Sequence, residues 1–524
     1  MRLLVDKWNI SVLALFFVMK ALQMFGRIGI RRQNDSWRRS MAPFFKAEHA
    51  KFTIAAFKLD FCSDLPPGTI VNLETAKKHV IDRLANFLRR HPEAHWKLAW
   101  SLTGVKRSRI KRADIIHVVF GQQGRLDNLE VYFDSAEDDG LETSPAMQEQ
   151  IVRWIKEAYN DTVRIYDESR PAILAKKIRK RLRVQLRGSK KERIDAELFT
   201  ERVLTGTYIH FSESLRYGES TNLERFDIPD LNGGMHPGFG LFNVHCRFSD
   251  YHREADLWFE ASHILVDGAI IQDLVENLKK SWGIRGVVKA PSPSEADSLV
   301  IQRCSPVWAK KPVFQGKLLV DFQSLLAVKK DLSHRYMLEV GGSITLASML
   351  AWGLAHTECF EGIKFLIPVD VHSPKSLERT LCHVIIRPQT YFTRKNPLCG
   401  FIEYQREFNR RLFAAREGRG EVQEMLDAFA LNPQFVNEVV YKLMPSAVHE
   451  LFGHAVITIL KESDFFVCPL DDIHTKGTIA FGSMNLPTED GGKAGWVTVR
   501  ANQDQVDRYL YYVRNVVQHF SKYL

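Results

Sequence analysis

The sequence has no Cys-x-x-Cys pair, no long apolar run and no strong excess of charge of one sign. Its seven cysteines are scattered over 524 residues, which indicates reduced thiols in a cytosolic setting and argues against a zinc site or a disulfide framework. Lys and Arg number 72 and Asp and Glu number 62, giving a formal net charge of +10. That surplus favours anionic partners without selecting one.

Residues 8–19 are the most apolar stretch near the N-terminus, an uncharged segment between Lys7 and Lys20. A helix that crosses a bilayer needs about 20 apolar residues, and a secretory signal ends in a small-residue cleavage site, where this segment continues into cations. The segment therefore predicts a helix packed on the protein body or an interfacial helix on a membrane, with a true anchor as the remaining alternative. The predicted location is cytoplasmic, with peripheral membrane contact as an option.

The composition is that of a folded protein, with 45% hydrophobic and 26% charged residues. At about 100–200 residues per domain, the length predicts two to four domains or two large halves. Residues 289–298 are rich in Pro and Ser and give the clearest linker. We expect an apolar and basic segment at 1–44, a first half at 45–288, a linker at 289–312 and a second half at 313–524.

Strand and helix patterns are mixed in both halves. In the first half we expect a buried strand at 52–60, a helix that begins after Asn72 and ends at His91-Pro92, and strands at 115–120 and 128–133. In the second half we expect a helix at 343–356, strands at 365–371 and 383–387, a hairpin with arms at 478–484 and 496–501, and a closing helix at 506–520. The predicted fold class is α/β (α+β), with a mixed sheet and packed helices in each half.

Residues 176–193 form a basic tract in which Ile178, Leu182 and Leu186 repeat at a spacing of four. This pattern predicts a cationic amphipathic helix. The helix either rests its apolar edge on the core or contacts a membrane surface or the phosphates of a cofactor. No nucleic-acid partner is expected, because no aromatic residues interleave with the charges.

The most informative segment is 256–283, which has the pattern of a strand, a turn and a helix. Apolar residues alternate with polar ones up to Ala261, so His263 continues the apolar face and is expected to point into the protein. An apolar stripe with helical spacing follows the turn, and Gly283 lies where a helix C′ residue is expected. Asp267 and Gly268 lie in the turn, where Asp can cap the helix and Gly permits a backbone conformation that other residues avoid.

The spacing of His263, Asp267 and Gly268 resembles the HxxxDG motif of the CoA-dependent acyltransferase superfamily, which includes chloramphenicol acetyltransferase, condensation domains and wax ester synthases. The resemblance covers about residues 45–524 and is nearest to the condensation and wax-ester-synthase branch. The early strand and its helix ending at His91-Pro92 resemble the opening of that branch. The helix at 343–356 and the Pro-Val-Asp strand that follows it resemble a second landmark of these enzymes.

The resemblance implies two chloramphenicol-acetyltransferase-like halves with an active-site tunnel between them and His263 at its centre. It also implies an acyl donor that enters as a CoA or carrier-protein thioester, so that acyl-CoA is a co-substrate and no cofactor or metal is bound permanently. The acceptor is expected to be an alcohol, with a lipidic one favoured by the apolar N-terminus and the basic tract. Amide-forming condensation on carrier-bound substrates is an alternative.

The chemistry of thioester transfer fits a single inward histidine. An acyl thioester is already activated, so an enzyme needs mainly to remove a proton from the attacking hydroxyl or amine and to stabilise the oxyanion. A histidine with a pKa near neutrality can act as this general base. Since no serine or cysteine lies in a recognisable nucleophile elbow, we expect direct transfer without an acyl-enzyme.

Four positions depart from the family pattern. Ser262 stands where many members have a first histidine, His372 stands where an arginine is usual, and Cys382-His383 replaces Gly-Asn. They motivate a further alternative, a non-catalytic acyltransferase-like binding or scaffolding module. In the families that the chain resembles, the motif aspartate pairs with the arginine that His372 replaces, so we expect Arg387 or protonated His372 to pair with Asp267, unless Asp267 only caps the helix.

Overall fold

The fold was analysed in a computed structural model of the 524-residue chain. The structure describes residues 51–61, 66, 72–101, 104–110, 114–120, 126–132, 143–161, 170–213, 242–248, 254–262, 268–283, 300–303, 314–370, 381–393, 396–417, 434–460, 466–467, 474–488, 491–501 and 505–524. The N-terminal segment 1–44, with its apolar stretch, lies outside these ranges, and so do His263, Asp267 and His372.

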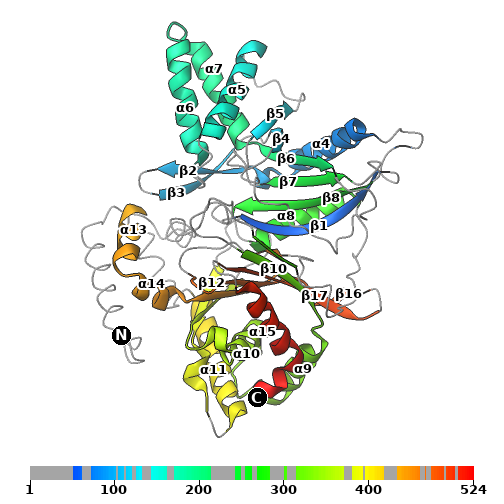
Figure 1. Ribbon diagram of the computed structural model, residues 1–524, viewed down its shortest axis with the longest axis vertical. Coiled ribbons are helices and arrows are strands. Elements are labelled where there is room, and N and C mark those ends of the chain that lie inside the picture. Colours follow the sequence, from blue (N-terminus) through cyan, green and yellow to red (C-terminus); the bar gives the residue numbers. More distant parts are fainter. Residues whose placement is uncertain are drawn as a thin grey trace.

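The described residues form two large sheets, one in each half of the molecule (Figure 1). The first sheet has seven strands in the order β14-β1-β8-β7-β6-β4-β5 and mixes parallel with antiparallel pairs. Its strands are β1 (Lys51–Asp60), β4 (Ile115–Phe120), β5 (Leu126–Tyr132), β6 (Thr207–Glu213), β7 (Asn243–Phe248), β8 (Glu254–Ser262) and β14 (Phe466–Val467). A separate hairpin pairs β2 (Trp96–Ser101) with β3 (Gly104–Arg109).

The second sheet has the order β12-β11-β13-β15-β17-β10-β9, with β16 paired to β17. Its strands are β9 (Val300–Arg303), β10 (Phe314–Val320), β11 (Phe365–Asp370), β12 (Leu381–Ile386), β13 (Ala455–Ile459), β15 (Gly477–Phe481), β16 (Leu486–Pro487) and β17 (Lys493–Ala501). This sheet is also mixed, since β13 runs parallel to β11 and β15 while β17 runs antiparallel to β15. The predicted α/β class with a mixed sheet in each half is confirmed.

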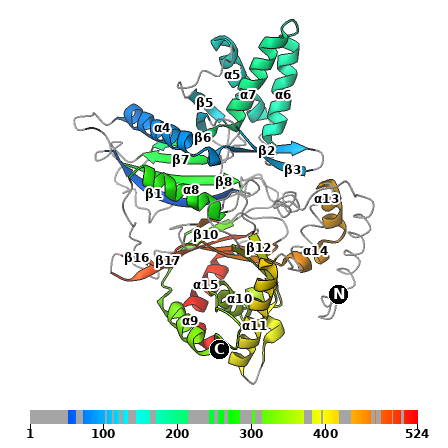
Figure 2. The ribbon, with the colours of Figure 1, turned by 180° about the vertical axis from the view of Figure 1, so that it is seen from behind.

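Helices cover the first sheet in two groups (Figures 1 and 2). The helices α4 (Leu73–Arg90) and α8 (Gly268–Ser281) join one apolar cluster with inward residues of β6, β7 and β8. The helices α5 (Pro145–Asp161), α6 (Arg170–Gln185) and α7 (Lys190–Thr205) join a second cluster with β4, β5 and β6. The short 3-10 helix η4 (Pro92–Ala94) follows α4.

The second sheet packs one face against its own helices (Figure 2). These are α9 (Gln323–Tyr336), α10 (Leu346–Ala355), α11 (Pro397–Arg416) and α15 (Val506–His519). The helices α13 (Gln434–Leu443) and α14 (Pro445–Phe452) lie beside the β12 edge in both ribbon views, and short 3-10 turns occupy Glu358–Phe360, Pro388–Tyr391 and Phe520–Tyr523. The large cluster that results is the core of this half.

Local sequence signals explain most of these elements. Asn72 caps α4 by accepting a hydrogen bond from the Thr75 amide at 2.9 Å, and His91 ends the helix ahead of Pro92. The predicted hairpin at the C-terminal end is the antiparallel pair β15 and β17, and the predicted closing helix is α15. The expected strand at 128–133 begins earlier and ends one residue sooner, as β5.

The basic tract differs from its prediction as a single helix over 176–193. The helix α6 ends at Gln185 and α7 begins at Lys190, because the Ser189 hydroxyl accepts from the Glu192 amide at 3.3 Å and starts a new helix. Ile178 and Leu182 are buried in the cluster shared by α5, α6 and α7. The apolar edge of α6 therefore packs on the core, while Arg179, Lys180 and Arg183 are exposed.

A strand pairing and an apolar contact join the two halves in addition to the chain that links them. β14 follows β13 of the second sheet but pairs with β1 of the first, with Thr53 opposite Val467. Ala480 of β15 joins the apolar cluster that contains α4 and α8. Within the range 289–312 predicted as a linker, Val300–Arg303 form β9 at the edge of the second sheet.

Candidate functional site

The predicted catalytic segment lies between two firmly held elements. The strand β8 ends at Ser262 and α8 begins at Gly268, so the described structure brackets His263 and Asp267 on both sides. Both neighbours of β8 are strands, with Lys51 of β1 opposite Ser262 and Asn243 of β7 opposite Glu260. Leu257, Phe259 and Ala261 are buried, as the alternation predicts. The roles of His263 and Asp267 stay predictions, because the structure does not describe these two residues.

The helix after the motif, α8, is held by its buried apolar residues and by contacts at its C-terminal end. Its apolar stripe is buried, and Gly283 follows it with a φ of 69°, a left-handed conformation that suits a C′ glycine. Arg83 of α4 donates a hydrogen bond from Nη1 to the Trp282 carbonyl at 2.9 Å and places its guanidinium over the Trp282 ring. The C-terminal end of α8 is therefore held against α4.

A strand from the second half reaches the same end of the first sheet. Thr53 of β1 lies opposite Glu260 of β8 on one side and opposite Val467 of β14 on the other. At about 4.8 Å between neighbouring strands, Val467 is roughly 10 Å from Glu260, which lies three residues before His263. Residues from both halves therefore meet near the predicted catalytic segment.

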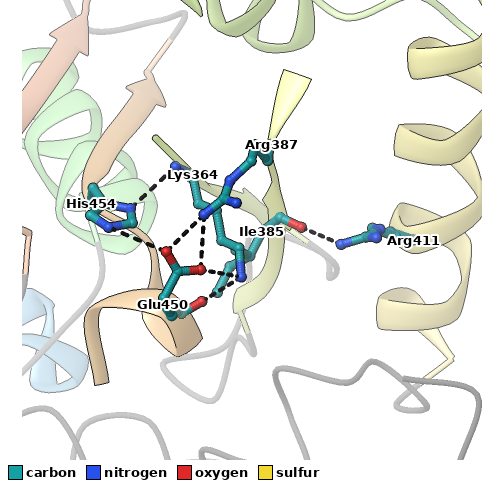
Figure 3. Close-up of polar contacts among 6 residues, drawn as sticks. All are labelled: Lys364, Ile385, Arg387, Arg411, Glu450 and His454. Carbon is teal, nitrogen blue, oxygen red and sulfur yellow. Dashed lines mark hydrogen bonds and ion pairs between the residues drawn. The ribbon is translucent and has the colours of Figure 1, made fainter. Parts of the chain in front are cut away.

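Arg387, the first candidate partner for Asp267, has a carboxylate partner in its own half (Figure 3). Its Nη2 lies 2.7 Å from Oε1 and 2.9 Å from Oε2 of Glu450 on α14. Lys364 donates from Nζ to the other side of the same carboxylate at 2.9 Å and to the Glu450 carbonyl at 2.8 Å. The Nδ1 of His454 accepts from the Lys364 amide at 3.2 Å, so this histidine nitrogen carries a lone pair.

Burial and charge set the pKa values in this cluster in opposite ways. Burial lowers the pKa of His454 to about 4 despite the attraction of Glu450, and the charges of Arg387 and Lys364 act in the same direction as burial. Burial alone raises the pKa of Glu450, but the hydrogen bond and charge of Lys364 and the charge of Arg387 bring the net pKa below its ordinary value. Burial lowers the pKa of Lys364 despite its bonds to Glu450. The cluster thus holds an ionised carboxylate beside a neutral histidine.

Arg387, the first candidate partner for Asp267, follows one end of the hairpin formed by β11 and β12, and His372 lies in the undescribed stretch that comes after the other end. β11 and β12 are antiparallel, with Phe365 opposite Ile386 and Asp370 opposite Leu381. Arg387 follows Ile386 at one end, whereas His372 comes two residues after Asp370 at the other. Five residues of strand separate Phe365 from Asp370 by roughly 17 Å, so Arg387 lies at the far end of the hairpin from Asp370.

Sequence reasoning missed a pair of neighbouring histidines on the first sheet. His245 of β7 is buried, and its ring lies 5.6 Å from that of His210 on β6, edge to face. The register places His245 opposite Trp258 of β8, five residues before His263. The alternation of apolar and polar residues along β6 and β7 could have placed both histidines on the face opposite the apolar cluster. It could not show that this opposite face is also covered.

Over the described ranges, no group of three or more His, Cys, Asp or Glu side chains is arranged to hold a metal ion. Over the same ranges, no helix has both the length and the apolar character needed to cross a bilayer.

Comparison with known proteins gives structural neighbours only. No family model matches the chain, and no curated protein matches it. Similar solved structures include the trichothecene 15-O-acetyltransferase TRI3 of Fusarium sporotrichioides (9% identity, 92% of this chain, 93% of that chain, TM-score 0.43). Another is the first condensation domain of the CDA synthetase (9% identity, 90% of this chain, 91% of that chain, TM-score 0.43). A third is F. graminearum TRI101 with coenzyme A and deoxynivalenol (9% identity, 91% of this chain, 96% of that chain, TM-score 0.38).

Proposed function

We propose that the chain is an acyltransferase that moves an acyl group from a CoA thioester to an alcohol, with His263 as the general base. The observation that supports this most is the strand and helix that bracket the HxxxDG segment. β8 and α8 hold the ends of a five-residue connection that contains His263 and Asp267. Such a short connection between two buried elements can present one imidazole in a fixed place.

The proposed reaction proceeds in one transfer without an acyl-enzyme. The imidazole of His263 takes the proton of the acceptor hydroxyl as its oxygen attacks the thioester carbonyl. The tetrahedral oxyanion then collapses, the C–S bond breaks, and the imidazolium returns the proton to the leaving thiolate. The acyl group ends on the acceptor oxygen, and CoA leaves as the free thiol.

The two halves have separate roles in this proposal. The first half, at 45–288, carries the base, and the second half, at 313–524, closes the site from the other side. Support comes from β14 and Ala480, which bring the second half to the sheet and the cluster that hold β8 and α8. We further propose that a tunnel between the halves admits the donor and the acceptor from opposite sides.

The test is release of free CoA from a panel of acyl-CoAs, with and without alcohol acceptors from a lipid extract. We expect release that depends on the alcohol, and mass spectrometry then identifies the ester. His263→Ala should lower the rate by about 10²–10⁴-fold, the usual contribution of general-base catalysis. His334→Ala, an exposed histidine on α9, is the matched control. A His263→Ala variant that keeps more than about a tenth of the rate would remove His263 from the mechanism.

The same assay separates the alternatives. Release that depends on amines rather than alcohols would favour amide-forming condensation. No release with any donor and acceptor, including carrier-bound thioesters, would favour a binding or scaffolding module, the alternative that Ser262, His372 and Cys382 motivate.

A further inference from the structure

The cationic face of α6 has no role in the proposed acyl transfer. The opposite face of this helix is occupied, because Leu174, Ile178 and Leu182 are fully buried in the cluster shared with α5 and α7. No Asp or Glu occurs between residues 170 and 191. The charge that α6 presents at its surface is therefore positive only.

Four exposed cations form a stripe along α6, called the basic stripe below: Lys176, Arg179, Lys180 and Arg183. Their spacings of three and four residues place them on one side of the helix. At a rise of 1.5 Å per residue, the basic stripe is roughly 10 Å long. Arg187 and Lys190 are also exposed and extend the positive surface into the turn and the start of α7.

Two acidic side chains of the neighbouring helices have cationic partners outside the basic stripe. Glu157 of α5 accepts from Arg181 at 2.8 Å, and Glu201 of α7 pairs with Lys97 of β2. Among the residues that the structure describes, no carboxylate forms an ion pair with the basic stripe. Burial and the charge of Arg179 lower the pKa of Lys97, so cations repel one another at the foot of α6. This surface favours an anionic partner.

The basic stripe lies on a part of the molecule that projects away from the second half (Figures 1 and 2). In both ribbon views α6 and α13 lie on the same side of the molecule. The helix α13 carries two apolar side chains four residues apart, Val439 and Leu443, which are 49% and 76% exposed. One side of the molecule therefore combines exposed cations with exposed apolar side chains.

This combination fits the surface of a membrane that contains acidic lipids. Clusters of Lys and Arg on a helix are attracted by the negative lipid surface, and apolar side chains can enter the boundary between headgroups and acyl chains. A protein interface would bring apolar residues to the centre of the contact, with charged groups at its rim. Here the cations and the apolar residues lie on separate helices, which a broad planar surface can contact together.

We propose that the side of the molecule that carries α6 and α13 docks on the surface of an anionic membrane. The basic stripe attracts the lipid headgroups, and Val439 and Leu443 enter the interface. The apolar edge of α6 is buried in the protein, so α6 contributes charge and not insertion. Stable binding takes two membrane signals, so this surface acts together with the apolar stretch at residues 8–19. The proposal does not depend on His263 or on acyl transfer.

The test measures binding of the full-length chain to phosphatidylcholine vesicles with and without phosphatidylserine, at low and at physiological salt. Binding should require phosphatidylserine and weaken with salt. The stripe variant combines Lys176→Gln, Arg179→Gln, Lys180→Gln and Arg183→Gln. Its affinity for the vesicles should fall by about tenfold or more, and that of Leu443→Ser by about threefold or more. All five side chains are exposed, so the melting temperature should stay near that of the wild type.

Two controls separate this surface from general effects. The charge control removes four exposed Lys from other elements: Lys78→Gln, Lys330→Gln, Lys493→Gln and Lys522→Gln. It lowers the net charge as much as the stripe variant does and should leave the vesicle affinity nearly unchanged. Leu338→Ser removes a 92% exposed leucine that follows α9, and it is the control for Leu443→Ser.

A loss of binding in the stripe variant that the charge control does not share supports the docking surface. The proposal is overturned if the wild type does not bind, if it binds equally without phosphatidylserine, or if the stripe variant keeps the wild-type affinity. Equal losses in the stripe variant and the charge control also overturn it, because only the net charge would then matter. Unchanged binding in Leu443→Ser would remove α13 from the surface. Stabilisation by inorganic phosphate without vesicle binding would assign the basic stripe to a free phosphate ligand and overturn the membrane proposal.

Discussion

Arg387 and Glu450 form a two-pronged contact in which one guanidinium nitrogen donates to both carboxylate oxygens, at 2.7 Å and 2.9 Å. This contact ties the end of β12 to α14, and Lys364 adds the start of β11 to the same carboxylate. Three segments that are up to 86 residues apart in sequence meet at Glu450. The cluster therefore stabilises the edge of the second sheet, independently of any catalytic role.

We expect measurable coupling between Arg387→Gln and Glu450→Gln in a double-mutant cycle. Both side chains are about one-third exposed, so the coupling free energy should be roughly 1 kcal/mol, the upper end for exposed pairs. Glu450→Gln alone should cost more than Arg387→Gln, because Lys364 loses its partner too. Urea unfolding measures all three variants.

The control is the pair Arg335 and Asp331 on α9, which is 63% and 51% exposed. Its coupling should be about 0.3–0.5 kcal/mol, as for exposed helix pairs. Coupling at Arg387 and Glu450 that does not exceed this control value would mean that the cluster in Figure 3 contributes nothing specific to stability.

Acid should destabilise the protein before its carboxylates titrate. Burial lowers the pKa of His454 and of His383 to about 4, from an ordinary 6.5, so the unfolded chain binds more protons than the folded one between these values. The contribution of these two histidines to stability is therefore constant above pH 6.5 and falls as the pH drops from 6.5 towards 4, by up to about 1.4 kcal/mol per pH unit for each group. Glu450, with a lowered pKa, contributes stability above pH 4.5 that is lost only at lower pH.

Urea unfolding at a series of pH values measures this slope. His454→Gln should remove part of it, because a glutamine carbonyl can still accept from the Lys364 amide without binding a proton. His334→Gln, on the exposed side of α9, should leave the slope unchanged. An identical slope in the wild type and His454→Gln would contradict the assignment.

Gly477→Ala should destabilise the second half strongly. At Gly477 an added Cβ would lie against the Arg500 carbonyl, and the φ of 88° is unfavourable for alanine. Gly491 has a similar φ of 84° but nothing near its Cβ position. Gly491→Ala should therefore cost about 1 kcal/mol of backbone strain, and Gly477→Ala about 3 kcal/mol or more, because the sheet backbone must also move. Equal losses of melting temperature in the two variants would show that the close approach has no cost.

Much of the fold could be predicted from patterns along the chain. The 3- and 4-spaced stripe of α4, its Asn72 cap and the alternation in β8 each depend on neighbouring residues, and the structure confirms all three. The break at Ser189 was missed because a fourfold apolar repeat continues through Leu186, and only the capping hydrogen bond reveals a new helix. Local patterns thus predict elements better than their ends.

The contacts between distant segments could not be predicted in this way. Lys317 and Arg500 alternate with Leu and Val, which by itself indicates strands with one face in solvent. Both residues are buried because the other half of the molecule covers that face. Likewise, nothing in the sequence near Arg387 indicates Glu450 as its partner, because the pairing depends on how α14 packs beside β12.

Full-length protein should bind anionic vesicles through its N-terminal segment. Residues 8–19 are apolar and lie among cations, and apolar insertion combined with surface attraction is what holds a peripheral helix on a bilayer. Flotation with vesicles that contain phosphatidylserine should be lost in a chain that starts at Gln33 and weakened by salt in the full chain. Equal flotation of the full chain and the shortened chain would assign binding to the exposed cations of α6. If neither protein floats with the vesicles, the prediction of membrane binding is wrong.

Double-mutant cycles can identify the partner of Asp267, because each candidate, Arg387 or His372, should couple with Asp267 only if the two side chains interact. Asp267→Asn should cost about 3–5 kcal/mol if it breaks a buried ion pair and about 1 kcal/mol if Asp267 only caps α8. Since Glu450 already accepts both bonds from Arg387 Nη2, we expect the effect of Asp267→Asn to add to that of Arg387→Gln and to couple with that of His372→Gln. Coupling with Arg387→Gln instead would mean that its guanidinium serves two carboxylates at once, and a cost near 1 kcal/mol with no coupling to either would identify Asp267 as a helix cap.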